Sequence, residues 1–282
     1  MSGEPSPASA KWGDLGVRAL SAAVLIPAVL ADVWAGGIWF HLFVALIGIL
    51  MAQEWVNIVH KDNPLQFALH AAGAMCGALL PLDVGLPGGI IAIAVLTAFS
   101  AIAAAREQPR GPAWRYLGVP YVSLPGIALV VLRNDPAYGI AAIVLVMLMV
   151  WAADTLAYFA GRIIGGPKLA PRISPRKTWA GMGGAMAGSA LAALCVGLAL
   201  GVPALWMLLI VAAALAVVEQ GGDLFKSAMK RYYGVKDSGR LIPGHGGVID
   251  RVDGLVAVAT AAALVGTLRA GIAHAGAGIL LW

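Results

Sequence analysis

Apolar runs of about 20 residues recur along the whole chain, and this repetition limits the fold more than any other feature. A helix needs about 20 predominantly apolar residues to cross a bilayer, and it satisfies its own backbone polar groups there. The 282-residue chain is 60% hydrophobic and only 12% charged, whereas soluble domains carry about 25% charged residues. The sequence therefore predicts an all-α polytopic membrane protein.

Nine runs are long enough to span a membrane. They lie at about residues 17–35, 38–56, 66–82, 86–105, 116–133, 138–160, 179–200, 203–222 and 252–273. With a cytoplasmic N-terminus, nine spans place 17 of the 19 Lys and Arg residues on the cytoplasmic side, as the positive-inside rule predicts. We therefore predict a flexible cytoplasmic tail (1–16), N-terminal transmembrane helices (17–135) and a C-terminal catalytic region (136–282) with cytoplasmic loops at 161–178 and 223–251.

Two features near the middle of the chain indicate anion or metal binding. Asp154 lies near the cytoplasmic end of the sixth span, where an acid costs several kcal/mol unless it is paired, hydrated or metal-bound. The loop from Gly165 to Thr178 combines prolines with hydroxyl and cationic side chains, which donate hydrogen bonds to phosphate. Thr178 precedes the seventh span and is a candidate N-cap. The alternatives are an interfacial acid bonded to a neighbouring helix, and a positively charged anchor at lipid headgroups.

The segment from residue 222 to residue 253 carries the most chemical information. If the eighth span continues as a helix, Asp223, Ser227 and Lys230 share one face. The glycines around His245 let the backbone approach a ligand closely, and Asp250 and Asp253 begin the last span. Carboxylates without thiols suit Mg²⁺, and Mg²⁺ among Lys and Arg residues is typical of nucleoside triphosphate sites.

At these residues the sequence resembles the phosphatidate cytidylyltransferase (CDP-diacylglycerol synthase) family. The family signature reads, in outline, S-x-x-K-R-x4-K-D, then P-G-H-G-G-x-x-D-R-x-D. It is matched by Ser227, Lys230, Arg231, Lys236, Asp237, Pro243, Gly244, His245, Gly246, Gly247, Asp250, Arg251 and Asp253. The stretch from Lys168 to Thr178 is similar to a second landmark of the family. In the N-terminal half, Arg18, Ser21 and Glu54–Trp55 give only a weak similarity.

The resemblance implies a Mg²⁺-dependent enzyme and suggests roles for residues. The metal ligands would be Asp223 and Asp250, with Asp154 and Asp253 as further candidates. The catalytic residues would be Asp223, Asp250, Lys230, Arg231 and His245. The substrate-binding residues would be Lys168, Arg172, Ser174, Lys177, Thr178, Ser227, Lys236, Asp237, Gly246, Gly247 and Arg251. A second, monovalent cation such as K⁺ has been associated with such sites.

The expected reaction joins CTP to phosphatidic acid and releases CDP-diacylglycerol and pyrophosphate. We expect an inner-membrane protein of a bacterial-type cell, with its active site facing the cytoplasm, membrane lipid around it and no nucleic-acid partner; a homodimer is compatible with the family. Lys226 departs from the family, which is expected to have Glu there, and Ala180 replaces an expected Glu or Gln. Three alternatives stay open: a CTP-dependent polyprenol or lipid kinase, a membrane transporter, and an inactive relative.

Overall fold

The chain is a multi-pass helical membrane protein. The computed structural model describes residues 23, 26–83, 85–239, 241 and 246–282. Seven helices in the described part are long and apolar enough to cross a membrane. They are α2 (Gly37–Val59), α4 (Gly85–Glu107), α5 (Trp114–Arg133), α6 (Gly139–Ile163), α7 (Trp179–Leu200), α8 (Leu205–Tyr232) and α9 (Ile249–Ala270). The length and apolar composition of these helices agree with the predicted helical membrane fold.

The two remaining predicted spans are helical over part or all of their length. The first is described as a short apolar helix, Ile26–Ala35. The third forms α3 (Pro64–Asp83), which is not one of the seven helices above. Its polar residue Gln66 is buried and donates from Nε2 to the Ser100 carbonyl at 3.1 Å, while the Ser100 hydroxyl donates back to it at 2.6 Å. The count of nine spans therefore stays a prediction.

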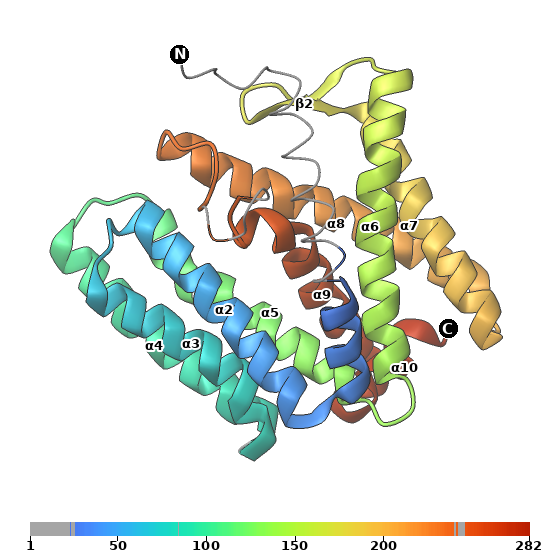
Figure 1. The fold of residues 1–282 in the computed structure, drawn as a ribbon, viewed down its shortest axis with the longest axis horizontal. Coiled ribbons are helices and arrows are strands. Elements are labelled where there is room, and N and C mark those ends of the chain that lie inside the picture. The colour runs from blue at the N-terminus through green and yellow to red at the C-terminus, as the bar shows by residue number, and fades with distance from the viewer. Residues whose placement is uncertain (1–22, 24–25, 84, 240, 242–245) are drawn as a thin grey trace, which may run out of the picture.

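The helices form a bundle in which α8 and α9 lie between two groups (Figure 1). Helices α2, α3, α4 and α5 pack together on one side, and α6 and α7 pack together on the other. The α6–α7 contact is close because α7 presents glycines to it. A Cβ at Gly188 would lie 2.3 Å from the Ala152 carbonyl oxygen, and one at Gly184 would lie 2.5 Å from that of Leu156. Small residues allow such approach between membrane helices.

The segment 161–178 is a structured element. After α6, the chain forms an antiparallel hairpin of β1 (Lys168–Ala170) and β2 (Ser174–Thr178), with Lys168 opposite Thr178 and Ala170 opposite Ser174. These two strands are an addition to the predicted all-α fold. Thr178 is the N-cap of α7, as its position predicts, and its hydroxyl accepts from the Gly181 N–H at 3.0 Å. The last residue of the hairpin therefore caps the membrane helix α7.

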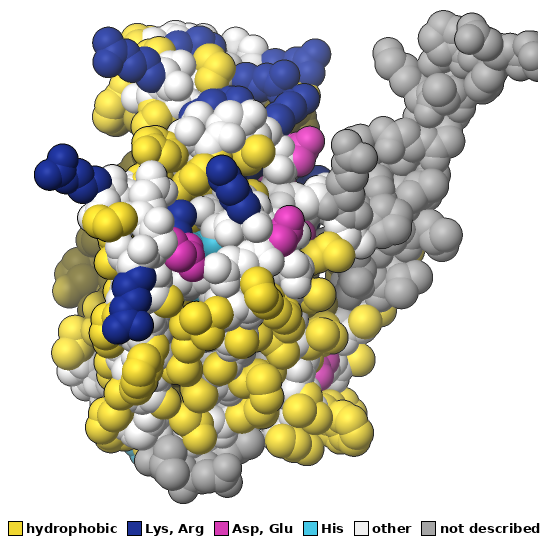
Figure 2. Space-filling model, turned by 90° about the vertical axis from the view of Figure 1, so that its left-hand side faces the viewer, with side chains coloured by type: hydrophobic (Ala, Val, Ile, Leu, Met, Phe, Trp, Pro, Cys, Tyr) yellow, Lys and Arg dark blue, Asp and Glu magenta, His cyan; other side chains and the backbone are white. Residues whose placement is uncertain are grey.

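Helices α8 and α9 both extend beyond the predicted spans. Helix α8 continues ten residues past residue 222, to Tyr232, and α9 begins at Ile249 rather than near 252. The chain then folds back through the short helices η1 (Ile272–His274) and α10 (Ala275–Leu280). In the face drawn in Figure 2, Lys and Arg side chains gather towards one end and hydrophobic side chains cover the other. The extended ends of α8 and α9 therefore carry their charged residues at the edge of the apolar region.

Candidate active site

Three carboxylates from α8 and α9 converge on one buried ammonium group. The ammonium belongs to Lys226, whose side chain is only 8% exposed. Its Nζ lies 2.5 Å from Asp253 Oδ2, 3.1 Å from Asp223 Oδ1 and 3.6 Å from Asp250 Oδ1. Asp223 precedes Lys226 by three residues on α8, and the two other acids are three residues apart at the start of α9. Helix periodicity places each of these pairs towards the same side.

Two further lysines each pair with one of these carboxylates. Lys177, at the end of β2, lies 2.6 Å from Asp223 Oδ2, and Lys230 on α8 forms an ion pair with Asp250 Oδ1. We call these three acids and three lysines the ion cluster. Burying an unpaired charge costs several kcal/mol, so this mutual pairing is what allows six ionisable groups to share a partly buried site.

Hydroxyl and backbone donors fix the orientation of two of the carboxylates. The Ser238 N–H and hydroxyl both donate to Asp250 Oδ2, each at 2.8 Å. The Ser227 hydroxyl lies 3.5 Å from Asp223 Oδ1, one helical turn away. Both oxygens of Asp250 and both oxygens of Asp223 therefore have partners, and Asp223 is the most exposed of the three acids, at 29%.

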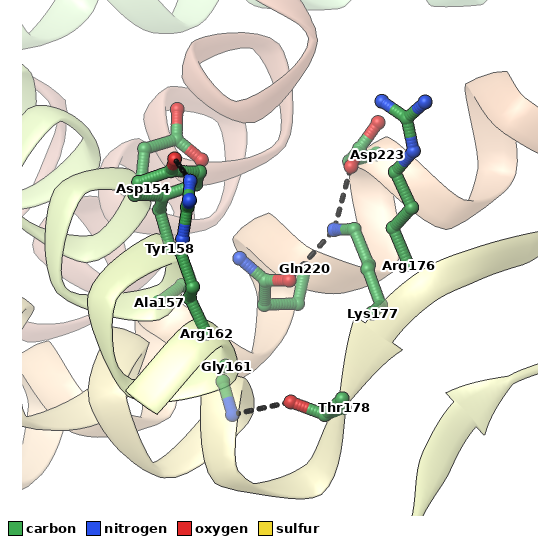
Figure 3. A pocket seen from close by; sticks show the side chains of 11 residues that line it. Asp154, Ala157, Tyr158, Gly161, Arg162, Arg176, Lys177, Thr178, Gln220 and Asp223 are labelled. Atoms are coloured by element: carbon green, nitrogen blue, oxygen red, sulfur yellow. Dashed lines mark hydrogen bonds and ion pairs between the residues drawn. The ribbon is translucent and has the colours of Figure 1, made fainter. Parts of the chain in front are cut away.

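A polar pocket of about 510 Å³ opens beside Asp223. Figure 3 shows that Lys177 reaches from β2 towards α8, where it contacts Gln220 Oε1 at 2.6 Å as well as Asp223. Arg176 and Arg162 also line this pocket, and Asp154 lines it from α6. The hairpin and the end of α6 thus place three cationic side chains around one cavity, an arrangement suited to a polyanionic ligand.

An apolar groove of about 470 Å³ lies on the other side of the ion cluster. It runs between α5, α8 and α9, and its wall includes Leu124, Val218 and Val256. Tyr121 and Phe225 stack in its wall with ring centroids 5.6 Å apart. Among the described residues that line it, Asp253 is the only acid. The ion cluster therefore touches a polar pocket through Asp223 and an apolar groove through Asp253.

Glu54, on α2, holds the start of α9. It is 2% exposed, and its two oxygens accept from the N–H groups of Val248 and Ile249 at 2.7 and 2.9 Å. Gly239 and Gly247 lie against it so closely that a Cβ on either would come within 2.6 Å of a Glu54 oxygen. A carboxylate at a helix N-terminus satisfies otherwise unpaired N–H groups. The N-terminal half of the chain thus positions the helix that carries Asp250 and Asp253.

The structure brings together some of the predicted site residues and separates others. Asp223, Asp250, Asp253, Lys177, Lys230 and Ser227 meet in or beside the ion cluster, and Gly246 and Gly247 precede it. Arg231 points to the hairpin, where its Nε lies 3.4 Å from the Ile173 carbonyl oxygen. Exposed positions are occupied by Lys168, Arg172, Lys236, Asp237 and Arg251, while Ser174 is half-buried at the start of β2. His245 lies outside the described residues.

Sequence reasoning overlooked several residues that the structure places at the site. Glu219 is 2% exposed and lies against Asp154, the acid predicted in the sixth span. The sequence could have indicated Glu219, because this residue precedes Asp223 by four positions and so shares its helix face. Arg176 and Gln220 line the polar pocket. Glu54 had shown only a weak similarity to the family, and no local pattern connects it with residues almost 200 positions away.

The donor chemistry of the site fits a Mg²⁺ ion that is completed by a ligand. Within the described residues, no group of three or more His, Cys, Asp or Glu side chains forms a metal site alone. However, Mg²⁺ is typically bound by one or two carboxylates together with substrate phosphates. Asp223 lines the polar pocket and has lone pairs beyond those used by Lys177 and Lys226. Asp250, in contrast, already accepts from two lysines and from both donors of Ser238. Asp223 could therefore hold such an ion together with a phosphate, and Asp250 would have to exchange a partner in order to join it.

Comparison with known proteins identifies many relatives. A sequence model of the cytidylyltransferase family matches residues 16–268. The phosphatidate cytidylyltransferase of Brucella abortus is 40% identical over 259 residues, which cover 91% of this chain and 95% of the relative. The proteins of the same name from Pseudomonas aeruginosa and Staphylococcus epidermidis are 36% and 33% identical, over 85% and 86% of this chain and 92% and 95% of their own.

The contact between Glu54 and α9 predicts a local loss of protection on substitution. In Glu54→Ala, the two N–H groups lose their acceptor, at a cost of about 1–3 kcal/mol each. Amide hydrogen exchange should therefore become at least about tenfold faster at the start of α9, as a loss of 1.4 kcal/mol implies, and stay unchanged in α4. Glu54→Gln keeps one carbonyl oxygen and should give an intermediate effect. Equal protection of residues 248–253 in all three proteins would contradict this role.

Proposed function

The chain belongs to the cytidylyltransferase family, and we propose from this that it transfers the cytidylyl group of CTP to phosphatidic acid in phospholipid biosynthesis. A phosphate oxygen of phosphatidic acid attacks the α-phosphorus of CTP. The bond from that phosphorus to the bridging oxygen breaks, and pyrophosphate leaves. The products are CDP-diacylglycerol and pyrophosphate, so phosphorus and charge balance without a redox partner.

The position of the ion cluster is the observation that carries this proposal. CTP is soluble and polyanionic, whereas phosphatidic acid keeps its acyl chains in the bilayer. The ion cluster touches the polar pocket through Asp223 and the apolar groove through Asp253. A reaction between the two substrates needs a site of this kind, at which a hydrophilic and a lipid-like cavity meet.

The polar pocket is the proposed binding site for the triphosphate of CTP. Arg162, Arg176 and Lys177 line it together. Arginine suits bidentate recognition of phosphate, and lysine acts as a compact point charge. Lys177 is already paired with Asp223 at 2.6 Å, so a bound phosphate would share this cation with the carboxylate. The hairpin thereby couples nucleotide binding to the carboxylates of α8.

The attacking group is already an anion, so the main barrier is repulsion between two negatively charged reactants. Lys177 and Lys230 supply fixed positive charge on the two sides of the ion cluster, and such groups stabilise charge that develops in the transition state. Mg²⁺ held by Asp223 on the side of the polar pocket would supply further positive charge to the phosphate oxygens. His245 would hydrogen-bond a phosphate or order the loop that contains it.

The apolar groove is the proposed place for an acyl chain of the lipid. Its wall is almost wholly apolar, and Asp253 marks the end nearest the ion cluster. A chain that lies between α5, α8 and α9 would bring its phosphate towards the ion cluster without leaving the apolar region. The lipid would then enter sideways between helices.

The proposal also covers the orientation of the protein in the membrane and its assembly into a dimer. The distribution of Lys and Arg favours nine spans and a cytoplasmic N-terminus, which puts the hairpin and the polar pocket on the cytoplasmic side, where CTP is present. A bacterial inner membrane is consistent with the organisms of the relatives. A homodimer remains a prediction from the family resemblance.

Label transfer from CTP tests the reaction directly. Purified protein in detergent micelles with phosphatidic acid, Mg²⁺ and α-³²P-labelled CTP should move label into the lipid fraction. With γ-³²P-labelled CTP, the label should appear in pyrophosphate and not in lipid. EDTA should abolish both. Label in lipid from the γ-position alone would indicate a lipid kinase, and folded protein that transfers neither label would reject an active transferase.

Substitution of Asp223 or Asp250 tests the carboxylates. Asp223→Asn removes the charge that would hold a metal ion, and Asp250→Asn removes the carboxylate that pairs with Lys226 and Lys230, while both keep the side-chain size. Turnover should fall by at least about 100-fold in each, the scale on which loss of one electrostatic contact acts. Asp62→Asn is the matched control, because Asp62 is exposed in the turn after α2. It should have normal activity. Turnover near that of the control in either variant would remove that residue from the mechanism.

A bulky residue in the apolar groove should impair lipid use selectively. Ala261 lines the groove on α9, and Ala261→Trp should raise the KM for long-chain phosphatidic acid several-fold while the KM for CTP stays unchanged. Ala187→Trp, at an exposed position of α7, is the matched control. An equal rise in both KM values, or none relative to the control, would argue against this lipid path.

A further inference from the structure

Lys226 occupies the point on which the three carboxylates of the site converge. Its Nζ is within 3.6 Å of an oxygen from each of Asp223, Asp250 and Asp253. Asp250 and Asp253 begin α9, whose start is held by Glu54, and Asp223 also pairs with Lys177. The lysine side chain is only 8% exposed. An ammonium at this point acts on the carboxylates as a bound cation would, but it is covalently attached to α8.

Apart from the neighbouring pair of Asp154 and Glu219, the charges of the ion cluster balance without any added ion. Three carboxylates face three ammonium groups, from Lys177, Lys226 and Lys230. Lys177 and Lys230 each pair with one carboxylate, whereas Lys226 contacts all three. Removal of Lys226 alone would leave an excess of negative charge at a site where the side chains of Asp250 and Asp253 are only 12% and 13% exposed. Such an excess is strongly unfavourable unless another cation replaces the lost one.

A second ion could not share this space. A cation at the convergence point would overlap Nζ and be repelled by its charge. Asp223 has the most exposed of the three carboxylates, at 29%, and it lines the polar pocket. The space for a divalent ion therefore lies on the pocket side, and not among the three acids.

We propose that the Lys226 ammonium is a fixed cation of the catalytic site, which takes the place among Asp223, Asp250 and Asp253 that would otherwise require a bound ion. The site then binds one divalent ion, on the side of the polar pocket, and needs no monovalent cation. That this site is catalytic rests on the proposed function. The replacement of a bound ion by Lys226 is a property of the protein without substrates and can be tested independently of the reaction.

Thermal unfolding of the substrate-free protein in detergent gives the first test. In a buffer with EDTA and choline chloride, Lys226→Met should melt about 5 °C or more below the wild type, because a buried ion pair is broken. Replacing choline by K⁺ at equal ionic strength, or adding excess Mg²⁺, should restore much of this loss. The wild type should show the same melting temperature in K⁺ and in choline. Lys61→Met, at an exposed position of the turn after α2, should behave like the wild type.

Mn²⁺ counted by electron paramagnetic resonance gives the second test. The wild type should bind at most one Mn²⁺ per chain at saturation, and Lys226→Met should bind one more than the wild type. If Lys226→Met does not fold, Lys226→Arg keeps the charge and should match the wild type in both measurements. Two Mn²⁺ ions per wild-type chain, or a wild-type melting temperature that rises in K⁺ relative to choline, would overturn the proposal. Neither measurement uses CTP, so the label-transfer experiment can fail without affecting this result.

Discussion

Pairing of charges between α8 and α9 is the interaction on which the rest of the site depends. Asp223, Asp250 and Asp253 lie within reach of one another at the edge of an apolar bundle, where each would be costly alone. The lysine on α8 that contacts all three, Lys226, joins the two helices at this level. Because Lys177 adds a contact from β2, the same charges also tie the hairpin to the bundle. The ion cluster is therefore both the candidate active site and the junction of three structural elements.

The N-terminal half of the chain contributes to this junction at a distance. Glu54 on α2 accepts the first N–H groups around the start of α9, and two glycines let the chain pass close to it. Helix α5 supplies part of the apolar groove. The N-terminal helices carried only a weak motif similarity, yet the family match covers them as well (residues 16–268). They position α9 and line the proposed lipid path, and they do more than anchor the protein in the membrane.

Much of this arrangement could be predicted from local sequence, because its signals are periodic. Long apolar runs predicted the membrane helices, and spacings of three, four and seven residues predicted that Asp223, Ser227 and Lys230 share a face. Contacts between distant segments could not be predicted in this way. No pattern indicates that Glu54 meets Val248, or that Lys177 reaches Asp223. The hairpin was missed because its prolines and charges resemble those of a loop, and its strands have only three and five residues.

The charge at position 226 decides how the three acids of the site are balanced. A carboxylate there would have placed four acids together, and their repulsion would have required bound cations. A lysine reverses the sign of the charge at the same point on the helix and pairs with the three remaining acids. Positive charge that is attached to the chain is present before any substrate or ion arrives. A site of this kind is organised in its resting state.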